Sequence, residues 1–260
     1  MELQALIFDV DGTLADTERD GHRVAFNAAF AEAGLDYWHW SVELYGQLLA
    51  ITGGKERIRH FIETCQPPLP AEEDLTALIA RLHQAKTRHY TALLAQGGIP
   101  LRPGVKRLLQ EARAAGIRLA IATTTTPENV TALLERALPE SLSWFEVIAA
   151  GDIVPAKKPA PDIYCYTLER MGLDPQECLA FEDSENGLRS ARQAGVPTVV
   201  TVNDYTRDQD FSGAALVLDH LGEPDLPFQV LAGRAGSHSY FSLELARQVH
   251  AQAIHSEVEN

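Results

Sequence analysis

Short apolar runs that end in polar residues recur along the chain. The first, LQALIFD, spans Leu3 to Asp9 and stops at a carboxylate. A continuous apolar run of this kind is typical of a parallel strand that is buried on both faces. The same pattern predicts further strands at Ile117–Thr123, Val147–Ala150, Cys178–Glu182, Pro197–Thr201 and Ala215–Leu218.

Helical segments lie between most of these predicted strands. We expect helices at Pro103–Ala115, Pro127–Ala137, Pro161–Met171 and Ser184–Ala194. Alternating strands and helices imply right-handed crossovers and an open parallel sheet with helices on both faces. The sequence therefore predicts an α/β fold with a Rossmann-like, doubly wound parallel sheet.

One long stretch, from the first strand to the helix near Pro103, lacks strands of the buried type. It is predicted to form helices at about Thr17–Ala33, Trp40–Leu49, Lys55–Thr64 and Glu72–Ala95. Because a structureless loop of this length is implausible in a compact domain, we expect an all-helical insertion. The predicted divisions are an α/β core at residues 1–15 and 100–233, a helical cap at residues 16–99 and a C-terminal extension at residues 234–260.

The C-terminal extension carries a weak helical pattern. Phe241, Leu245, Val249 and Ala253 follow one another at spacings of four residues, as on one face of an amphipathic helix. Docking of this helix on the domain or on a partner and a frayed tail are equal alternatives at this point.

The charge balance is acidic, with 22 Lys and Arg residues against 36 Asp and Glu residues and a net charge of −14. We expect no nucleic-acid partner, because nucleic-acid binding needs clustered cations, although a local basic pocket for a small phosphorylated ligand is compatible with this charge. No apolar run approaches the length of a membrane span, and the first residues form a strand pattern rather than a signal peptide. The three cysteines, Cys65, Cys165 and Cys178, lack CxxC spacing, which favours a reduced, cytoplasmic protein.

Four polar segments follow predicted strands at their carboxyl ends, where open parallel sheets bind ligands. Asp9 and Asp11 follow the first strand in DVDGT. Two carboxylates this close favour a bound divalent cation, the alternative being a solvated strand end. Thr123 and Thr124 follow the second strand, where hydroxyls and backbone N–H groups before a helix form either an anion site or a helix cap.

The other two segments add a cation and a second acidic pair. Lys158 precedes a proline in KKPAPD, which would fix its charge beside a phosphate, the alternative being a solvated lysine pair. Glu182 and Asp183 follow CLAFE and complete an oxygen-rich site that suits Mg²⁺, or else cap the next helix. Together, in this order and all at strand ends, the four segments are far more specific than any one of them alone.

This arrangement resembles the haloacid dehalogenase superfamily over residues 3 to about 220. The insertion after the first strand resembles the helical cap of the phosphoglycolate phosphatase and β-phosphoglucomutase groups of that superfamily. The resemblance implies that Asp9 is a nucleophile that forms an aspartyl-phosphate. It also implies that Asp11 first protonates the leaving alkoxide and then takes a proton from the attacking water.

The same resemblance assigns the remaining core residues. Thr123, the Thr124 backbone and Lys158 would hold the phosphoryl oxygens. Mg²⁺ would bind Asp9, the main-chain carbonyl of Asp11 and Asp183, with Glu182 in or just outside its coordination sphere.

The cap sequence narrows the substrate class. Within the superfamily, the segments DVDGTLADTE, DTERDGHRVAFNAAF, ITGGKERI and HQAKT resemble the CbbY group. That group includes phosphatases acting on xylulose 1,5-bisphosphate, a misfire product and inhibitor of Rubisco, which implies a role beside the Calvin cycle. ERDGHR is one residue longer than the ELHR-like spacing of some bacterial members and resembles the plant-type version.

The cap residues themselves favour a substrate with two phosphates. Backbone N–H groups and neighbouring cations bind phosphate, and Thr52, Gly53 and Gly54 precede two cations in this sequence. Glu18 is expected to accept protons from sugar hydroxyls. The residues expected to form the distal phosphate pocket are His22, Lys55, Arg57 and Lys86.

We therefore predict a monomeric, Mg²⁺-dependent phosphatase for a small sugar bisphosphate, whose cap closes to exclude water and opens for release. A β-phosphoglucomutase-like mutase and a phosphoglycolate-type phosphatase are the alternatives within the superfamily. A non-catalytic regulatory protein is a third alternative, which the intact Asp9, Asp11, Thr123, Lys158 and Asp183 disfavour.

Overall fold

Seven strands form a single sheet in the order β3-β2-β1-β4-β5-β6-β7 in the computed structural model of the chain, which describes residues 1–70 and 74–258. All neighbouring strands are parallel except β6 and β7. The six predicted strands and the α/β class are confirmed. The strands are β1 (Ala5–Phe8), β2 (Arg118–Thr123), β3 (Phe145–Ala150), β4 (Cys178–Glu182), β5 (Thr198–Thr201), β6 (Leu216–Leu218) and β7 (Val230–Gly233).

The antiparallel strand β7 is the one element of the sheet that the apolar pattern does not predict. All four of its residues are exposed. A strand at the exposed edge of a sheet needs no buried apolar run, so the criterion that finds the other strands does not apply to it.

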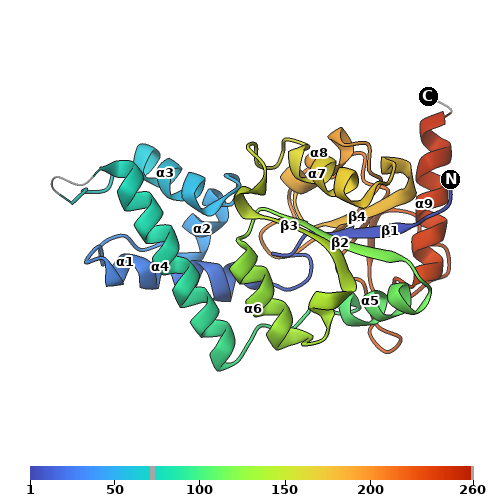
Figure 1. The fold of residues 1–260 in the computed structure, drawn as a ribbon, viewed down its shortest axis with the longest axis horizontal. Coiled ribbons are helices and arrows are strands. Elements are labelled where there is room, and N and C mark those ends of the chain that lie inside the picture. The colour runs from blue at the N-terminus through green and yellow to red at the C-terminus, as the bar shows by residue number, and fades with distance from the viewer. Residues whose placement is uncertain (71–73, 259–260) are drawn as a thin grey trace.

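Helices cover both faces of the sheet (Figure 1). In β1, Leu6 and Phe8 belong to the apolar cluster that contains residues of α5 and α6, whereas Ala5 and Ile7 belong to the cluster that contains residues of α7 and α8. This division follows from the alternation of side chains along a strand. The four helices are α5 (Val105–Ala114), α6 (Pro127–Ala137), α7 (Asp162–Met171) and α8 (Glu185–Gln193).

The segment between β1 and α5 is helical and lies beyond the carboxyl ends of the strands (Figure 1). Its helices have an apolar cluster of their own, which includes Trp38 and Trp40. The Glu72 at which the last cap helix is predicted to begin lies outside the described residues, and the domain bounds stay predictions. The cap helices are α1 (Arg23–Glu32), α2 (Val42–Leu48), α3 (Gly54–Cys65) and α4 (Leu75–Gln96).

The helix predicted at Thr17–Ala33 divides into a π-helical turn, Glu18–His22, and α1. A π-helical turn holds one residue more than an α-helical turn and often marks a functional site. The wider π-helical turn accommodates the residue by which ERDGHR exceeds the ELHR-like spacing. Glu18 and His22 both line the same small cavity beside Asp11.

The C-terminal extension docks on the core domain through α9 (Leu243–Val258). Phe241, Leu245 and Val249 are buried in the same apolar cluster as one face of the sheet. The ring of Phe241 meets the ring of Phe181 of β4 edge-on, with the centroids 5.4 Å apart. Of the two alternatives, docking is therefore confirmed, and a frayed tail is wrong for residues 241–254.

The three cysteines are free thiols. Cys65 at the end of α3 and Cys165 in α7 are exposed, and Cys178 in β4 is buried. Within residues 1–70 and 74–258, none of the helices has the length and apolar character that crossing a membrane requires.

Candidate active site

The site lies where the strand order changes direction. Strands β2 and β3 continue on one side of β1, and β4 to β6 on the other, so the carboxyl ends of β1 and β4 form a topological switch point. Phe8 pairs with Phe181 across these two strands. Asp9 therefore emerges beside Glu182, and the backbone N–H of Asp9 donates to the carbonyl of Phe181 at 3.0 Å.

Lys158 reaches between these two carboxylates. Its Nζ donates to Asp9 Oδ1 at 2.7 Å, to Glu182 Oε1 at 2.6 Å and to the carbonyl of Ala122 at 2.9 Å. Burial alone would lower the pKa of Lys158, but the two carboxylates hold it above its usual value. The lysine is a buried, fixed positive charge rather than half of a solvated pair.

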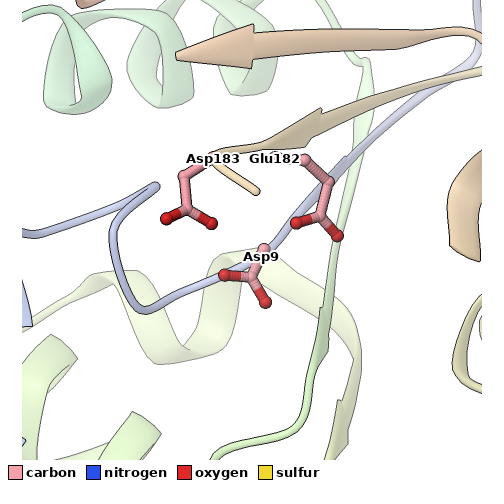
Figure 2. A group of neighbouring side chains, drawn as sticks. All are labelled: Asp9, Glu182 and Asp183. Atoms are coloured by element: carbon pink, nitrogen blue, oxygen red, sulfur yellow. The ribbon is translucent and has the colours of Figure 1, made fainter. Parts of the chain in front are cut away.

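A third carboxylate completes an acidic cluster (Figure 2). Asp9, Glu182 and Asp183 are buried, and each offers an oxygen within 4.8 Å of the others. Burial raises the pKa of Asp9 to about 7, with Lys158 opposing the shift. Burial, together with the charges of Asp9 and Glu182, raises the pKa of Asp183 well above its usual value.

The donor set of this cluster fits a hard divalent cation. Glu182 Oε2 is buried and lacks a hydrogen-bond partner. Three crowded carboxylates, one of them with an unpaired oxygen, are stabilised when a cation shares their charge. Oxygen donors of this kind suit Mg²⁺, which binds a few carboxylates and keeps several waters.

The second aspartate of DVDGT points toward the cap side of the site. Asp11 Oδ1 accepts hydrogen bonds from Thr17 Oγ1 at 2.6 Å and from His22 Nε2 at 2.8 Å. Burial alone would raise the pKa of Asp11, but the charge and hydrogen bond of His22 and the hydrogen bond of Thr17 hold it below its usual range. The pKa of Asp9 is therefore raised and that of Asp11 is lowered, and pairs of carboxyl groups with different catalytic tasks commonly differ in this way.

Two cavities that share part of their lining lie beside these residues. The first, of about 80 Å³, contains the predicted phosphate ligands with the nucleophile: Asp9, Thr123, Thr124 and Lys158 line it together. The second, of about 40 Å³, lies toward the cap. The residues that line both are Asp11, Glu18, Arg57 and Thr124.

Most of the predicted distal pocket lines the second cavity. His22, Gly53, Gly54 and Lys86 lie there. Lys86 is buried, and its Nζ lies 5.1 Å from the centroid of the Phe26 ring. Burial lowers the pKa of Lys86 to about 8.

Arg57 and Glu18 are joined by a residue that the sequence does not single out. Tyr45 donates its hydroxyl proton to Glu18 Oε2 and accepts a hydrogen bond from Arg57 Nη1 at 3.0 Å. Burial and the charge of Glu18 raise the pKa of Tyr45 well above its usual value, so the hydroxyl stays a donor. The cationic and anionic cap residues are thereby held in one network.

Two predicted cap residues instead connect the cap to the core domain. Lys55 lines neither cavity; its Nζ lies 2.7 Å from Oδ2 of Asp152, which Lys157 also contacts at 2.6 Å. Thr52 lines the first cavity, and its Oγ1 accepts a hydrogen bond from Asn186 Nδ2 of α8 at 3.1 Å. The role of Lys55 in substrate binding stays a prediction, without support from its position.

Sequence reasoning also missed Tyr164 and His83. Tyr164 of α7 donates to Glu182 Oε1 at 2.5 Å, and His83 of α4 lines the second cavity. Both lie on the buried sides of helices, where the apolar pattern makes an aromatic residue look like part of the core. The sequence does offer one signal: the hydroxyl of tyrosine and the ring nitrogens of histidine need hydrogen-bond partners when they are buried.

Comparisons with known proteins agree with this geometry. The sequence matches the family described as haloacid dehalogenase-like hydrolase over residues 3–195. It is 50% identical over 252 residues to protein CbbY (plasmid) of Cupriavidus necator, which covers 95% of this chain and 97% of that protein. It is 30% identical over 200 residues to the phosphorylated carbohydrates phosphatase of Thermotoga maritima, over 77% of this chain and 85% of that protein.

A solved structure extends the likeness to the whole architecture. The crystal structure of a CbbY mutant from Rhodobacter sphaeroides in complex with xylulose 1,5-bisphosphate superposes with a TM-score of 0.79. The two sequences are 48% identical, over 84% of this chain and 94% of that chain.

Proposed function

Because the chain belongs to the haloacid dehalogenase-like hydrolases, we propose that it is a magnesium-dependent phosphatase that converts xylulose 1,5-bisphosphate to xylulose 5-phosphate. The family and its phosphatase relatives make it a phosphoric monoester hydrolase, of the sugar phosphatase kind. The proposal concerns the finer points: the bisphosphate, the metal and the steps of the reaction. Such an activity would remove an inhibitor of Rubisco.

The two cavities, with the lining residues that they share, are the observation that carries the proposal. One holds Asp9 and Lys158, which suits the phosphate to be cleaved, and the other holds Lys86 and His22, which suits a second phosphate. Arg57 lines both. A ligand with two anionic ends therefore has a cation at each end, whereas a monophosphate leaves the second set of cations without a partner.

In the proposed mechanism, Asp9 attacks the phosphorus atom and the bond from phosphorus to the sugar oxygen breaks. Asp11 donates a proton to the departing alkoxide. Water then attacks the aspartyl-phosphate while Asp11 accepts its proton, and inorganic phosphate leaves. Lys158, Thr123 and the Thr124 backbone hold the phosphoryl oxygens throughout.

Asp9, the Asp11 carbonyl, Glu182 and Asp183 would hold Mg²⁺, in keeping with the fit of the acidic cluster. When bound, Mg²⁺ would offset the charge of the nucleophile and of the phosphoryl group. His22 and Thr17 hold Asp11 in its ionised form, which is the form that accepts a proton from water. The acid step requires a protonated Asp11, so Asp11 must first take up a proton, either from solvent or from His22 Nε2, which lies 2.8 Å from Asp11 Oδ1.

Replacement of Lys86 tests the substrate assignment. Lys86→Met removes a buried cation of the second cavity while it keeps most of the side-chain volume. Losing a charge-assisted contact worth about 1.5–3 kcal/mol lowers kcat/KM for xylulose 1,5-bisphosphate about 10- to 100-fold. Hydrolysis of p-nitrophenyl phosphate, which leaves the second cavity empty, changes little.

Arg59→Met is the matched control, because Arg59 is an exposed cation of the same cap that lines neither cavity. It should retain bisphosphate hydrolysis within a few-fold of the parent. Equal loss on both substrates in Lys86→Met would mean that Lys86 acts through the fold of the cap, and no loss on either would remove the main support for a bisphosphate.

A further inference from the structure

Arg102 lies outside the motifs that carry the chemistry, yet it is one of the most buried charges in the described chain. It occupies the segment between the cap and α5, and 7% of its surface is exposed. Its backbone N–H donates to the carbonyl of Leu14 at 2.8 Å. The side chain therefore starts beside the loop that follows β1.

The guanidinium joins three loops through backbone carbonyls. Arg102 Nη1 donates to Gly12 in the loop after β1 and to the carbonyl of Thr201 at the end of β5, at 2.9 Å in the second case. Arg102 Nη2 donates to the carbonyls of Val202 at 2.5 Å and Asp219 at 2.8 Å, which follow β5 and β6. A planar group with several fixed donors can satisfy this set, and a lysine ammonium cannot match its geometry.

Gly12, the first of these acceptors, lies directly against the carboxylate of Asp183. Gly12 has φ +85°, and a Cβ at this position would lie 2.2 Å from Asp183 Oδ2 and 2.7 Å from Asn203 Nδ2. The backbone of Gly12 thus limits where the Asp183 carboxylate can lie. Arg102 fixes that backbone through the Gly12 carbonyl.

Asn203 contacts the same oxygen of Asp183. Its Nδ2 donates to Asp183 Oδ2 at 2.7 Å. Asn203 directly follows Val202, whose carbonyl Arg102 binds.

We propose that Arg102 is a positioning residue for the metal ligand Asp183: by binding the carbonyls of Gly12 and Val202 it holds the two backbone segments between which Asp183 is oriented. It sets the affinity for the divalent cation without touching the cation or the substrate. The inference rests on the proposed function only in taking Asp183 as a ligand of Mg²⁺.

The test is the dissociation constant of Mg²⁺, measured by titration calorimetry on the full chain without substrate. Replacing groups that orient metal ligands typically costs 10- to 100-fold in metal affinity, and we expect Arg102→Met to raise the Mg²⁺ dissociation constant by about this factor. At saturating Mg²⁺ the KM for substrate should stay near the parent value. Arg102→Lys keeps the charge but loses the planar set of donors of the guanidinium. Its affinity for Mg²⁺ should therefore lie between those of the parent and of Arg102→Met.

Arg107→Met is the matched control for lost stability. Arg107 of α5 also donates to backbone carbonyls, those of Gly222 at 2.7 Å and Phe241 at 3.2 Å, and it pairs with Glu223. It lines none of the cavities around Asp9. We expect this variant to unfold at a lower temperature and to bind Mg²⁺ as the parent does.

Parental Mg²⁺ affinity in Arg102→Met would overturn the inference, as would an equal loss of affinity in Arg107→Met. If Arg102→Met does not fold, Arg102→Lys decides: parental affinity in that variant also overturns the inference. Failure of the parent itself to bind Mg²⁺ would overturn the proposed metal site as well. Binding by the parent thus distinguishes failure of the inference about Arg102 from failure of the proposed metal site.

Discussion

Among single residues, Lys158 sets the electrostatics of the site. Its ammonium contacts Asp9 and Glu182 at once, and the ring of Tyr164 lies under it with the centroid 5.5 Å from Nζ. A carboxylate this deeply buried would otherwise be protonated near neutral pH. Lys158 thereby favours the ionised Asp9 that can attack phosphorus.

Asp9→Asn should abolish turnover because it keeps the shape of the side chain and removes the attacking oxygen anion. The variant also removes a buried charge that repels Glu182 and Asp183, so we expect it to stay folded. Phosphate release and thermal unfolding measure the two effects. The exposed Asp208→Asn serves as the control with parental activity, and turnover by pure Asp9→Asn above background would refute the covalent mechanism.

His83 makes stability depend on pH. Burial lowers the pKa of His83 to about 3, with the charges of Lys86 and Lys55 adding to the shift. The unfolded chain takes up a proton near the ordinary pKa of about 6.5, so the unfolded state binds more protons below that value. This contribution to stability is therefore complete above about pH 6.5 and is lost as the pH falls toward 3.

We expect the parent to lose more free energy of unfolding between about pH 7 and about pH 5 than His83→Gln does. Urea denaturation at the two pH values measures the difference. His39→Gln, at an exposed position, should lose as much as the parent. An identical pH dependence in His83→Gln and the parent would contradict the assignment of this effect to His83.

At the scale of elements, α9 stabilises the sheet from the α5 side. Phe241 is fully buried and packs on Phe181, one residue before Glu182. Removing a buried phenylalanine side chain costs about 3–5 kcal/mol, which is the loss in free energy of unfolding that we expect for Phe241→Ala. Leu231→Ala on the exposed β7 should stay within about 0.5 kcal/mol of the parent.

Urea denaturation measures both variants. Phe241 lies on the face of the sheet opposite Tyr164, so Phe241→Ala should keep its kcat at temperatures where it is folded. A loss of kcat with little change in stability would show that the segment leading into α9 takes part in the reaction rather than in the fold alone.

The sequence predicts the position of a site residue well where that position depends on the end of a single strand. Asp9, Thr123 and Glu182 each lie at or directly after the last residue of a buried parallel strand, and parallel strands bring these ends together. Arg102 and Tyr45 could not be found in this way, because their partners come from distant segments. Lys55 was grouped with Arg57 by spacing alone, and spacing does not reveal that Asp152 lies opposite it.

At the scale of the whole molecule, the cap contacts the core domain through α4 packed on α6, through the rings of Tyr45 and Tyr205, and through polar contacts that include those of Asn186 and Lys55. Asn186 Nδ2 donates to the carbonyl of Ala50 and to Thr52 Oγ1, both at 3.1 Å, and Lys55 pairs with Asp152. The side chains of Lys55 and Asp152 are 43% and 65% exposed, so their pair contributes at most about 1 kcal/mol. An exposed pair of this kind therefore contributes little to holding the cap against the core domain.

The double variant Asn186→Ala/Lys55→Met should shift the cap toward an open arrangement. We expect a larger radius of gyration in small-angle X-ray scattering and a higher KM, with each single change having a smaller effect. Arg88→Met is the control, because it breaks an exposed pair with Glu32 inside the cap and leaves the cap–core contacts intact. An unchanged radius of gyration in the double variant would mean that other contacts hold the cap.

Because of where its three thiols lie, the native sequence allows the predicted opening of the cap to be followed by fluorescence without any added cysteine. Cys65 is exposed in the cap, Cys165 is exposed in the core domain, and Cys178 is buried. Thiol-reactive fluorophores should therefore label one position in the cap and one in the core domain, and leave the third sulfur untouched while the protein is folded. Energy transfer between the two dyes would then report, in real time and in the native sequence, each closure of the cap during turnover.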